Sequence, residues 1–360
     1  MIVTYIYSSN VADQNRVQVR CRNFADAINR LGAHSANLLD LNSFLQNTPE
    51  AQAVCVGSDL IVIHRYLYGP VLRAVQYWKA RDKKVVVDFD QALNYLSPGI
   101  QGYSFWMEGV PLEEEPSLSK EQMPRIDPIP FEQFKWGLGL VDAAIVSSAR
   151  LADDWAHFTN VIEIPDYINI DQYPALHKDY EDEINIGLCN STKYSRSNNS
   201  GLLKVLEEIC RKNARVKLVL CDLESTEMDK LGIPLAQVLT YSSSSVEEWA
   251  SILPRLDIGV FSITGDYDLR CSRLTLLEFM VSKIPWIASD LAIFRPLASY
   301  GTLVQNSSED WDGALMHVIE RIDLYRKKAA GEPFLFALSQ DINGNIDKVL
   351  RLYTTIINQL

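Results

Sequence analysis

Short runs of consecutive apolar residues alternate along the chain with segments whose apolar residues recur every three or four positions. The continuous runs predict buried strands, and the periodic segments predict amphipathic helices that pack on them. The predicted strands are 2–8, 59–64, 85–90, 143–147, 160–164, 184–189, 216–221, 256–262 and 285–290. The predicted helices are 18–31, 70–82, 131–140, 201–211, 246–254, 274–282, 309–326 and 344–358. Alternating strands and helices are typical of α/β folds with parallel strands and crossover helices.

The alternation occurs twice and is interrupted by the polar segment 171–183. A chain of 360 residues is long enough for two domains. We therefore expect two Rossmann-like, doubly wound parallel-sheet domains that face each other across a ligand-binding cleft. The expected domains are 1–175 and 176–336, and the helix within 337–360 is expected to return to the first domain.

Residues 97–130 break the rhythm with six prolines and an acidic triplet, Glu113–Glu115. This insertion is either a binding segment over the site or a solvated connection, and the sequence favours neither. Trp106 within it is a weak candidate for stacking on a sugar ring.

Charge and composition narrow the function. The chain has 34 basic and 46 acidic residues, a net charge of −12, and neither half is basic, which disfavours a nucleic-acid partner. No apolar run is long enough for a membrane span, and the N-terminus does not have the pattern of a signal peptide. Six cysteines are scattered without a C-x-x-C motif, which is typical of reduced thiols, so we expect a cytoplasmic protein. Nothing in the sequence indicates an oligomeric state.

The segment 257–290 carries the most specific chemistry: a predicted strand, a polar loop, and a helix that begins near Leu274. The N–H groups at a helix start favour phosphate. Glu278 lies about one helical turn beyond Thr275, so its carboxylate could accept hydrogen bonds from ribose hydroxyls. The segment therefore predicts a nucleoside diphosphate site, assisted by Arg270, Ser272, Arg273 and Thr275.

Residues 270–289 read RCSRLTLLEFMVSKIPWIAS, which resembles the donor-binding region of family 4 (group 1) glycosyltransferases, retaining enzymes of the GT-B fold. Nine residues match that pattern without a gap: Thr275, Leu276, Leu277, Glu278, Met280, Pro285, Ile287, Ala288 and Ser289. The resemblance implies that Glu278 holds the ribose and that the backbone at Leu274 and Thr275 holds the diphosphate. It also implies donor contacts from the adjoining loop and from the first loop of the second domain, at Asn190, Ser191, Asp268, Cys271 and Ser272.

Two positions depart from the family pattern. Arg270 stands where the family has a first Glu that contacts the donor sugar, and Lys283 stands where it usually has Gly. Arg270 could contact phosphate instead, and the sugar-binding role could pass to Asp266 or Asp268. We expect Arg270, Arg273 and Glu278 to be the catalytic residues, with the two arginines stabilising the departing diphosphate.

Other parts of the chain resemble the family only at the level of the fold, at 20–32, 143–151, 162–171 and 186–191. Asp166 replaces an Asn of the family pattern in the third of these segments.

The first domain supplies the candidate acceptor side, because polar residues follow several of its predicted strands. These residues are Ser9, Asn10, His64, Arg65, Asp88 and Asp90. His64 fits either an acceptor contact or a structural role. Asp88-Phe89-Asp90 fits acceptor contact or helix capping better than metal binding, which the family does not need. Arg16 and Arg20 fit either charges near the ligand or a solvated helix face.

These features predict a retaining glycosyltransferase that moves a hexose from a nucleotide-diphosphate sugar, of the UDP or GDP type, to an acceptor. The acceptor would be a glycan, a lipid-linked molecule or a small molecule. We expect neither a metal ion nor another cofactor. Two alternatives stay open: a non-catalytic subunit that binds a sugar nucleotide or glycan, and a sugar-nucleotide epimerase. An NAD enzyme is disfavoured because no G-x-G-x-x-G follows the first strand.

Overall fold

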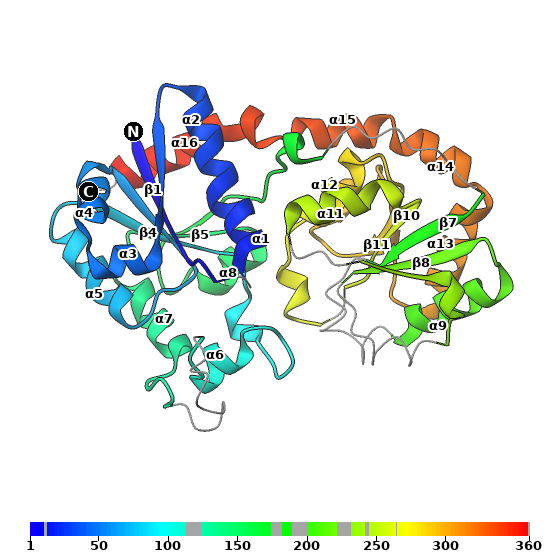
Figure 1. Cartoon of the computed structure of the whole chain (residues 1–360), viewed down its shortest axis with the longest axis horizontal. Coiled ribbons are helices and arrows are strands. Elements are labelled where there is room, and N and C mark those ends of the chain that lie inside the picture. Colours follow the sequence, from blue (N-terminus) through cyan, green and yellow to red (C-terminus); the bar gives the residue numbers. More distant parts are fainter. Residues whose placement is uncertain are drawn as a thin grey trace. The chain divides into compact units, whose positions relative to one another are not determined.

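The computed structural model describes residues 1–10, 13–112, 124–173, 182–188, 200–221, 232–241, 245–263 and 265–358. The chain forms two compact units, each built on one six-stranded parallel sheet with helices on its faces (Figure 1). Unit 1 comprises Met1–Asp166, Arg270–Ser272 and Ile342–Leu360, and unit 2 comprises Tyr167–Leu269 and Arg273–Asp341. The predicted α/β class with two Rossmann-like parallel sheets is confirmed.

The sheet of unit 1 has the strand order β2-β1-β3-β4-β5-β6. Its strands are β1 (Ile2–Tyr7), β2 (Ser35–Asp40), β3 (Leu60–His64), β4 (Lys84–Phe89), β5 (Ala143–Val146) and β6 (Val161–Glu163). The chain leaves β1 in one direction for β2 and in the other for β3, so the strand order reverses between β1 and β3. Ligands of doubly wound sheets bind beyond the carboxyl ends of the strands at such a point.

The helices of unit 1 begin and end where the sequence supplies caps. Asp40, Thr48 and Ser148 cap α3, α4 and α8 with their side chains, and α2 ends at Gly32 with a φ of 75°. These helices are α1 (Gln14–Val17), α2 (Asn23–Leu31), α3 (Leu41–Gln46), α4 (Pro49–Gly57), α5 (Pro70–Lys79), α6 (Tyr103–Glu108), α7 (Pro130–Leu138), α8 (Ala149–Trp155) and α16 (Ile342–Asn358), with a π-helix, η2 (Gln18–Arg22).

The last helix of the chain belongs to unit 1. In Figure 1, α16 lies beside α2, and the two helices are in contact. The hydroxyl of Tyr353 on α16 hydrogen-bonds that of Tyr5 on β1 at 3.0 Å, in the interior of the unit.

The sheet of unit 2 has the strand order β12-β11-β10-β7-β8-β9. Its strands are β7 (Ile184–Leu188), β8 (Val216–Cys221), β9 (Val238–Tyr241), β10 (Ile258–Phe261), β11 (Trp286–Ser289) and β12 (Thr302–Val304). Its helices are α9 (Ser200–Lys212), α11 (Val246–Ile252), α12 (Leu274–Val281), α13 (Ser308–Glu320), α14 (Ile322–Ala329) and α15 (Glu332–Ser339). The strand order reverses between β7 and β10, which places the corresponding ligand position at their carboxyl ends.

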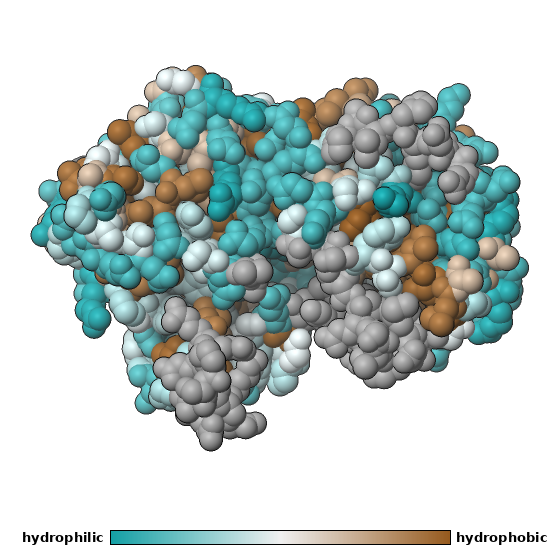
Figure 2. Space-filling view, viewed as in Figure 1, coloured by the Kyte–Doolittle hydropathy of each residue, from teal (hydrophilic) through white to brown (hydrophobic). Residues whose placement is uncertain are grey.

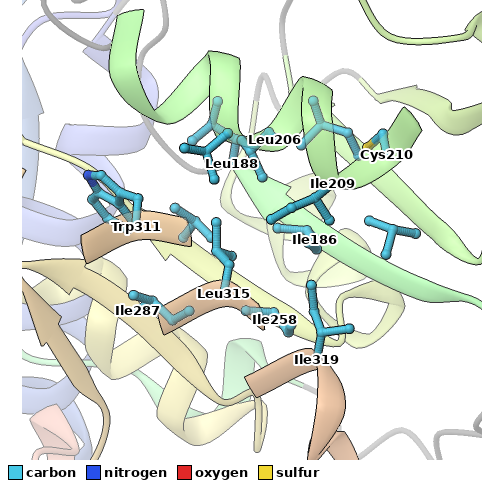
Figure 3. Packing of buried hydrophobic residues seen from close by; sticks show 14 of the residues in the cluster. Ile186, Leu188, Leu206, Ile209, Cys210, Ile258, Ile287, Trp311, Leu315 and Ile319 are labelled. Carbon is cyan, nitrogen blue, oxygen red and sulfur yellow. The ribbon is translucent and has the colours of Figure 1, made fainter. Parts of the chain in front are cut away.

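One part of the core of unit 2 forms where α9 and α13 cover one face of this sheet (Figure 3). Residues from both helices pack on the strands: Leu206, Ile209 and Cys210 of α9, and Trp311, Leu315 and Ile319 of α13, against Ile186, Leu188, Ile258 and Ile287. Burial raises the pKa of the Cys210 thiol to about 11, so this cysteine is an inert apolar side chain at neutral pH.

Short one-turn 3₁₀ segments complete the described fold: η3 (Leu93–Tyr95), η4 (Ile170–Gln172), η6 (Leu235–Gln237), η7 (Leu253–Arg255), η8 (Asp268–Arg270) and η9 (Arg295–Leu297). The proline-rich insertion contains the helix α6, and its acidic triplet lies outside the described residues. Figure 2 shows a largely hydrophilic face with scattered hydrophobic patches. Within the ranges that the structure describes, no helix is long and apolar enough to cross a bilayer.

Candidate functional site

Arg20 lies inside unit 1, where the π-helix η2 faces the strands β4 and β6. Its guanidinium donates to both carboxylate oxygens of Asp88, at 2.9 and 2.7 Å, and to Asp166 Oδ1 at 2.9 Å. It also donates to the carbonyl of Ile164 at 2.8 Å, and the Arg20 side chain is fully buried. Arg20 is therefore a structural ion-pair centre that joins three segments. Its partner Asp166 is also the residue that replaces the Asn of the family pattern.

A second ion-pair cluster follows β3 and β4. Arg65 donates to Asp13 at 2.8 Å and to Asp90 at 2.7 Å, and Arg16 approaches Asp90 at 3.1 Å. Burial by itself would raise the pKa of Asp90, but the charges of Arg65 and Arg16 outweigh that effect and hold the pKa well below its usual range. Both carboxylates of the Asp88-Phe89-Asp90 motif thus already have arginine partners. Nowhere in the described part of the chain do three or more His, Cys, Asp or Glu side chains gather to hold a metal ion.

His64 ends β3 between these clusters and is only 1% exposed. Neither of its ring nitrogens has a hydrogen-bond partner among the described residues. Burial, followed by the nearby charge of Arg65, lowers the pKa of His64 to about 3. The imidazole is therefore neutral at physiological pH, and its role toward a ligand stays a prediction.

A cavity of about 560 Å³ opens in unit 1 at the carboxyl ends of β1 and β2. The predicted residues Ser9 and Asn10 line it. Its other lining residues come from the segment after β1, the start of α3, the segment after β3 and the insertion: Ser8, Asp40, Leu41, Asn42, Leu45, Tyr66, Tyr68, Pro70, Pro111, Leu112 and Ile126. Trp106 is not in this lining; it is 3% exposed and packs against Tyr66 and Phe134.

The predicted donor segment is divided between the two units, since Arg270–Ser272 clusters with unit 1. The Arg270 guanidinium forms an ion pair with Asp154, with Nη2 3.0 Å from Oδ1, and stacks 3.4 Å above the Tyr95 ring. The Arg270 carbonyl accepts a hydrogen bond from Ser148 Oγ at 3.0 Å. Arg270 is thus anchored at both its side chain and its backbone. Ser272 and Cys271 are half-buried beside it.

In unit 2, α12 begins at Leu274 after the loop that follows β10, and its N-cap residue Arg273 provides no side-chain cap. The Arg273 guanidinium donates to Gln340 at 2.7 Å. Thr275 is half-buried in the first turn of α12, as the sequence predicts for a helix start near Arg273.

Glu278 lies one turn further along α12 and is 8% exposed. Its two carboxylate oxygens accept one hydrogen bond each: Oε1 from the Tyr173 hydroxyl at 2.8 Å and Oε2 from the Trp249 indole N–H at 3.0 Å. Burial and the charge of Glu278 raise the pKa of Tyr173 well above its usual value, so the phenol stays a donor. The carboxylate is therefore held in one orientation by two aromatic side chains that sequence reasoning missed.

The loop after β10 is fastened by uncharged side chains. The N–H of Ile263 donates to Ser289 Oγ at 2.8 Å, Ser289 Oγ donates to Asn306 Oδ1 at 2.7 Å, and Asn306 Nδ2 donates to the Ile263 carbonyl at 2.8 Å. These bonds join the carboxyl ends of β10, β11 and β12. They give a structural reason for Ser289, the last residue that matches the family pattern.

Asp268 lies in this loop, and burial raises its pKa to about 6. A carboxyl group with this pKa is partly protonated just below neutral pH and can donate as well as accept. Asn190 and Ser191 lie outside the described residues. The roles of the remaining donor-side residues toward a ligand stay predictions.

Comparison with known structures confirms the fold. A glycosyltransferase from Rickettsia africae ESF-5 superposes with a TM-score of 0.65 at 11% identity, covering 100% of this chain and 99% of that one. Anabaena Alr3699/HepE in complex with UDP and glucose superposes with a TM-score of 0.62 at 12% identity, covering 99% and 100%. A putative UDP-N-acetylglucosamine 2-epimerase from Listeria monocytogenes gives 0.55 at 11%, covering 98% and 96%. No family model and no curated protein matches the sequence. The chain therefore has the GT-B fold of glycosyltransferases.

Proposed function

We propose that the protein is a retaining glycosyltransferase that transfers a hexose from a nucleotide-diphosphate sugar, UDP or GDP type, to a glycan, lipid-linked or small-molecule acceptor in the cytoplasm. The observation that carries the proposal is Glu278, a buried carboxylate fixed by Tyr173 and Trp249 one turn into a helix that follows the central strand β10. A fixed carboxylate at this place can accept hydrogen bonds from a ribose diol.

In the proposed reaction, the bond between the anomeric carbon and the β-phosphate oxygen breaks and a bond to an acceptor oxygen forms. The acceptor's hydroxyl proton passes to the departing diphosphate. The start of α12, at Leu274 and Thr275, stabilises the charge on that diphosphate through the helix dipole, together with Arg273. No protein nucleophile is assigned. Because Asp88 and Asp90 already pair with arginines, we propose that transfer needs no metal ion held by these residues.

The test is a thermal-shift screen against UDP, GDP, ADP and their sugars, followed by calorimetry with the nucleotide that stabilises the protein. A ligand well above its Kd raises stability by a few kcal/mol. Glu278→Gln is expected to weaken nucleotide diphosphate binding by about 10–100-fold, because a charge-assisted pair of hydrogen bonds is lost. The matched control is Glu320→Gln on the exposed face of α13, which should bind as the wild type does. Equal affinity of Glu278→Gln and wild type would refute the donor site.

Arg270 favours the second candidate function, a non-catalytic subunit that binds a sugar nucleotide or glycan. It replaces the first Glu of the family pattern and is engaged with Asp154 and Tyr95. Slow release of nucleotide diphosphate from one sugar nucleotide supports the transferase. Binding without turnover across the panel supports the subunit, and conversion of the donor without any acceptor supports the epimerase.

A further inference from the structure

The cavity of unit 1 is lined by both polar and apolar residues. The polar residues come from the segment after β1 and from the end of β2 with the start of α3: Ser8, Ser9, Asn10, Asp40 and Asn42. The apolar and aromatic residues come mainly from α3, the segment after β3 and the insertion: Leu41, Leu45, Tyr66, Tyr68, Pro70, Pro111, Leu112 and Ile126. A ligand that matches both kinds of lining residue is amphipathic.

One of the two carboxylate oxygens of Asp40 makes no hydrogen bond within the described part of the chain. Its Oδ1 caps α3 by accepting from the backbone N–H of Asn42 at 2.8 Å and of Ser43 at 3.3 Å. Its Oδ2 is buried and has no hydrogen-bond partner among the described residues. A buried carboxylate oxygen without a donor is energetically unfavourable. Oδ2 is closed to solvent, so a small movement of the Asp40 side chain is needed before a ligand hydroxyl can donate to it, and that hydrogen bond would remove the cost of the unsatisfied oxygen.

Among the described residues that line the cavity, Asp40 is the one charged side chain, and there is no lysine or arginine. Arg65 lies next to the lining residue Tyr66, just after β3, but its guanidinium is paired with Asp13 and Asp90. A phosphorylated ligand would therefore lose water beside Asp40 without gaining a cationic partner, which is unfavourable. The charges favour an acceptor group without phosphate.

The aromatic side of the cavity is rigid. The Tyr66 ring stacks on Trp106 at a centroid distance of 6.0 Å, and the half-buried Tyr68 ring meets Phe105 edge-on at 5.0 Å. The Tyr66 hydroxyl donates to Asp13 at 2.6 Å. Fixed aromatic rings bind an apolar group or a sugar face with little loss of conformational entropy.

We propose that this cavity binds the acceptor as an uncharged glycoside with an apolar aglycone, its sugar hydroxyls toward Asp40 and its aglycone toward Tyr68 and Leu112, and that it disfavours phosphorylated acceptors. This inference rests on the proposed function, which it narrows to one class of acceptor.

The experiment uses the full chain and calorimetry with phenyl β-glycosides of several hexoses, each paired with its own 6-phosphate. At least one phenyl glycoside is expected to bind about tenfold more tightly than its 6-phosphate. Asp40→Asn keeps a residue that caps helices as well as Asp does, but it puts an amide N–H₂ group or a neutral oxygen where Oδ2 lies. It should weaken glycoside binding about tenfold, whereas Asp153→Asn on the exposed surface of α8 should not.

A gain of binding provides the reciprocal test. Leu112 is 36% exposed at the cavity, and Leu112→Lys supplies the missing cation. This variant should bind the 6-phosphates better than the wild type does. Tighter binding of the 6-phosphates by the wild type, no binding of any phenyl glycoside, or an Asp40→Asn affinity equal to wild type would each overturn the inference.

Different results would refute the inferred acceptor class and the proposed transferase function. If UDP or GDP binds through Glu278 but only phosphorylated acceptors bind in unit 1, the acceptor class is wrong and the transferase proposal stands. If phenyl glycosides bind through Asp40 and no nucleotide does, the transferase proposal fails and the cavity is a glycoside-binding site.

Discussion

The carboxyl ends of the two sheets are built from different chemistry. In unit 1, charged side chains face each other there: the buried Arg20 and Arg65 and the exposed Arg16 pair with Asp13, Asp88, Asp90 and Asp166. In unit 2, the ends of β10, β11 and β12 are joined by the neutral side chains Ser289 and Asn306. The ion pairs at the first sheet are largely buried, whereas at the second sheet the buried contacts are uncharged and the ion pair of Asp290 with Arg295 is exposed.

The difference bears on which charges are available to a ligand. Arg16, Arg20 and Arg65 are each paired with aspartates, so their presence in unit 1 does not make the cavity a phosphate site. In unit 2, α12 begins after Arg273 without a side-chain cap, and Glu278 is held by the neutral donors Tyr173 and Trp249 rather than by an arginine. A charged residue in a sequence therefore indicates a ligand contact only where the fold does not already neutralise it.

The largest expected effect is a loss of stability when Arg20, the centre of the first ion-pair cluster of unit 1, is replaced. Arg20→Met leaves the buried Asp88 without its cation and the buried Asp166 with Arg16 alone, 3.9 Å away. Breaking a buried ion pair from one side costs about 3–5 kcal/mol. Urea unfolding followed by tryptophan fluorescence measures the loss. Arg351→Met, at an exposed position of α16, is the matched control and should change stability by less than about 0.5 kcal/mol. A stable Arg20→Met variant with weakened ligand binding would instead make Arg20 a ligand contact.

The comparison also explains how far the sequence predicted the fold. The buried central strands were found because both of their faces are covered and their sequences are continuously apolar. The missed strands are β2, β9 and β12, three of the four strands that end the sheets. An edge strand such as β2 has several partly exposed positions and lacks an apolar run. The predicted helix 309–326 is two helices, α13 and α14, with Arg321 between them.

The site was predictable to the extent that its residues lie close in sequence. Thr275 and Glu278 share one helix, so their spacing alone placed them together. Tyr173 and Trp249 bind Glu278 from 105 and 29 positions away, and no local pattern marks such partners. The same holds for Arg20 and Asp88, which are 68 positions apart. Sequence reasoning left Arg20 between a solvated helix face and a charge near the ligand, and only the tertiary contacts showed a buried ion pair.

The prediction of intermediate size concerns Asp268, in the loop after β10. Burial raises the pKa of Asp268 to about 6, so the folded protein binds more protons than the unfolded chain between about pH 4 and 6. The resulting stability is fully present below pH 4 and is lost as the pH rises through 6. Asp268→Asn removes the buried charge and should raise stability at pH 8 by about 1–2 kcal/mol, with the gain shrinking toward pH 4.

Thermal unfolding of Asp268→Asn and wild type across this pH range measures the difference. Asp312→Asn, on the exposed surface of α13, is the control for a change of one charge and should not reproduce the pH dependence. A gain that is independent of pH would show that Asp268 titrates normally. Loss of nucleotide-sugar binding in the same variant, with nucleotide diphosphate binding kept, would support the sugar contact considered for Asp268.

The smallest effect concerns the end of α12, where Lys283 replaces the usual Gly of the family pattern. Lys283 has a φ of 57°, and the helix closes with hydrogen bonds from Lys283 N to the Met280 carbonyl at 3.1 Å and from Ile284 N to the Phe279 carbonyl at 2.9 Å. This closure is a Schellman motif, whose left-handed position favours glycine. A side chain there costs about 1 kcal/mol, which gives the family's glycine a structural reason independent of any ligand.

Lys283→Gly relieves this strain but loses the ammonium above the Phe334 ring, 4.6 Å from its centroid, an exposed contact that contributes about 0.5 kcal/mol. The net expectation is a gain in unfolding free energy of about 0.5 kcal/mol. Lys283→Ala keeps the strain and loses the contact, so it should fall about 0.5 kcal/mol below the wild type. Urea unfolding should give the highest unfolding free energy for Gly at position 283, then Lys, then Ala. This order separates the backbone strain from the cation–π contact. Were Lys283→Gly to fall below Lys283→Ala, the left-handed backbone would not be the reason for the family's glycine.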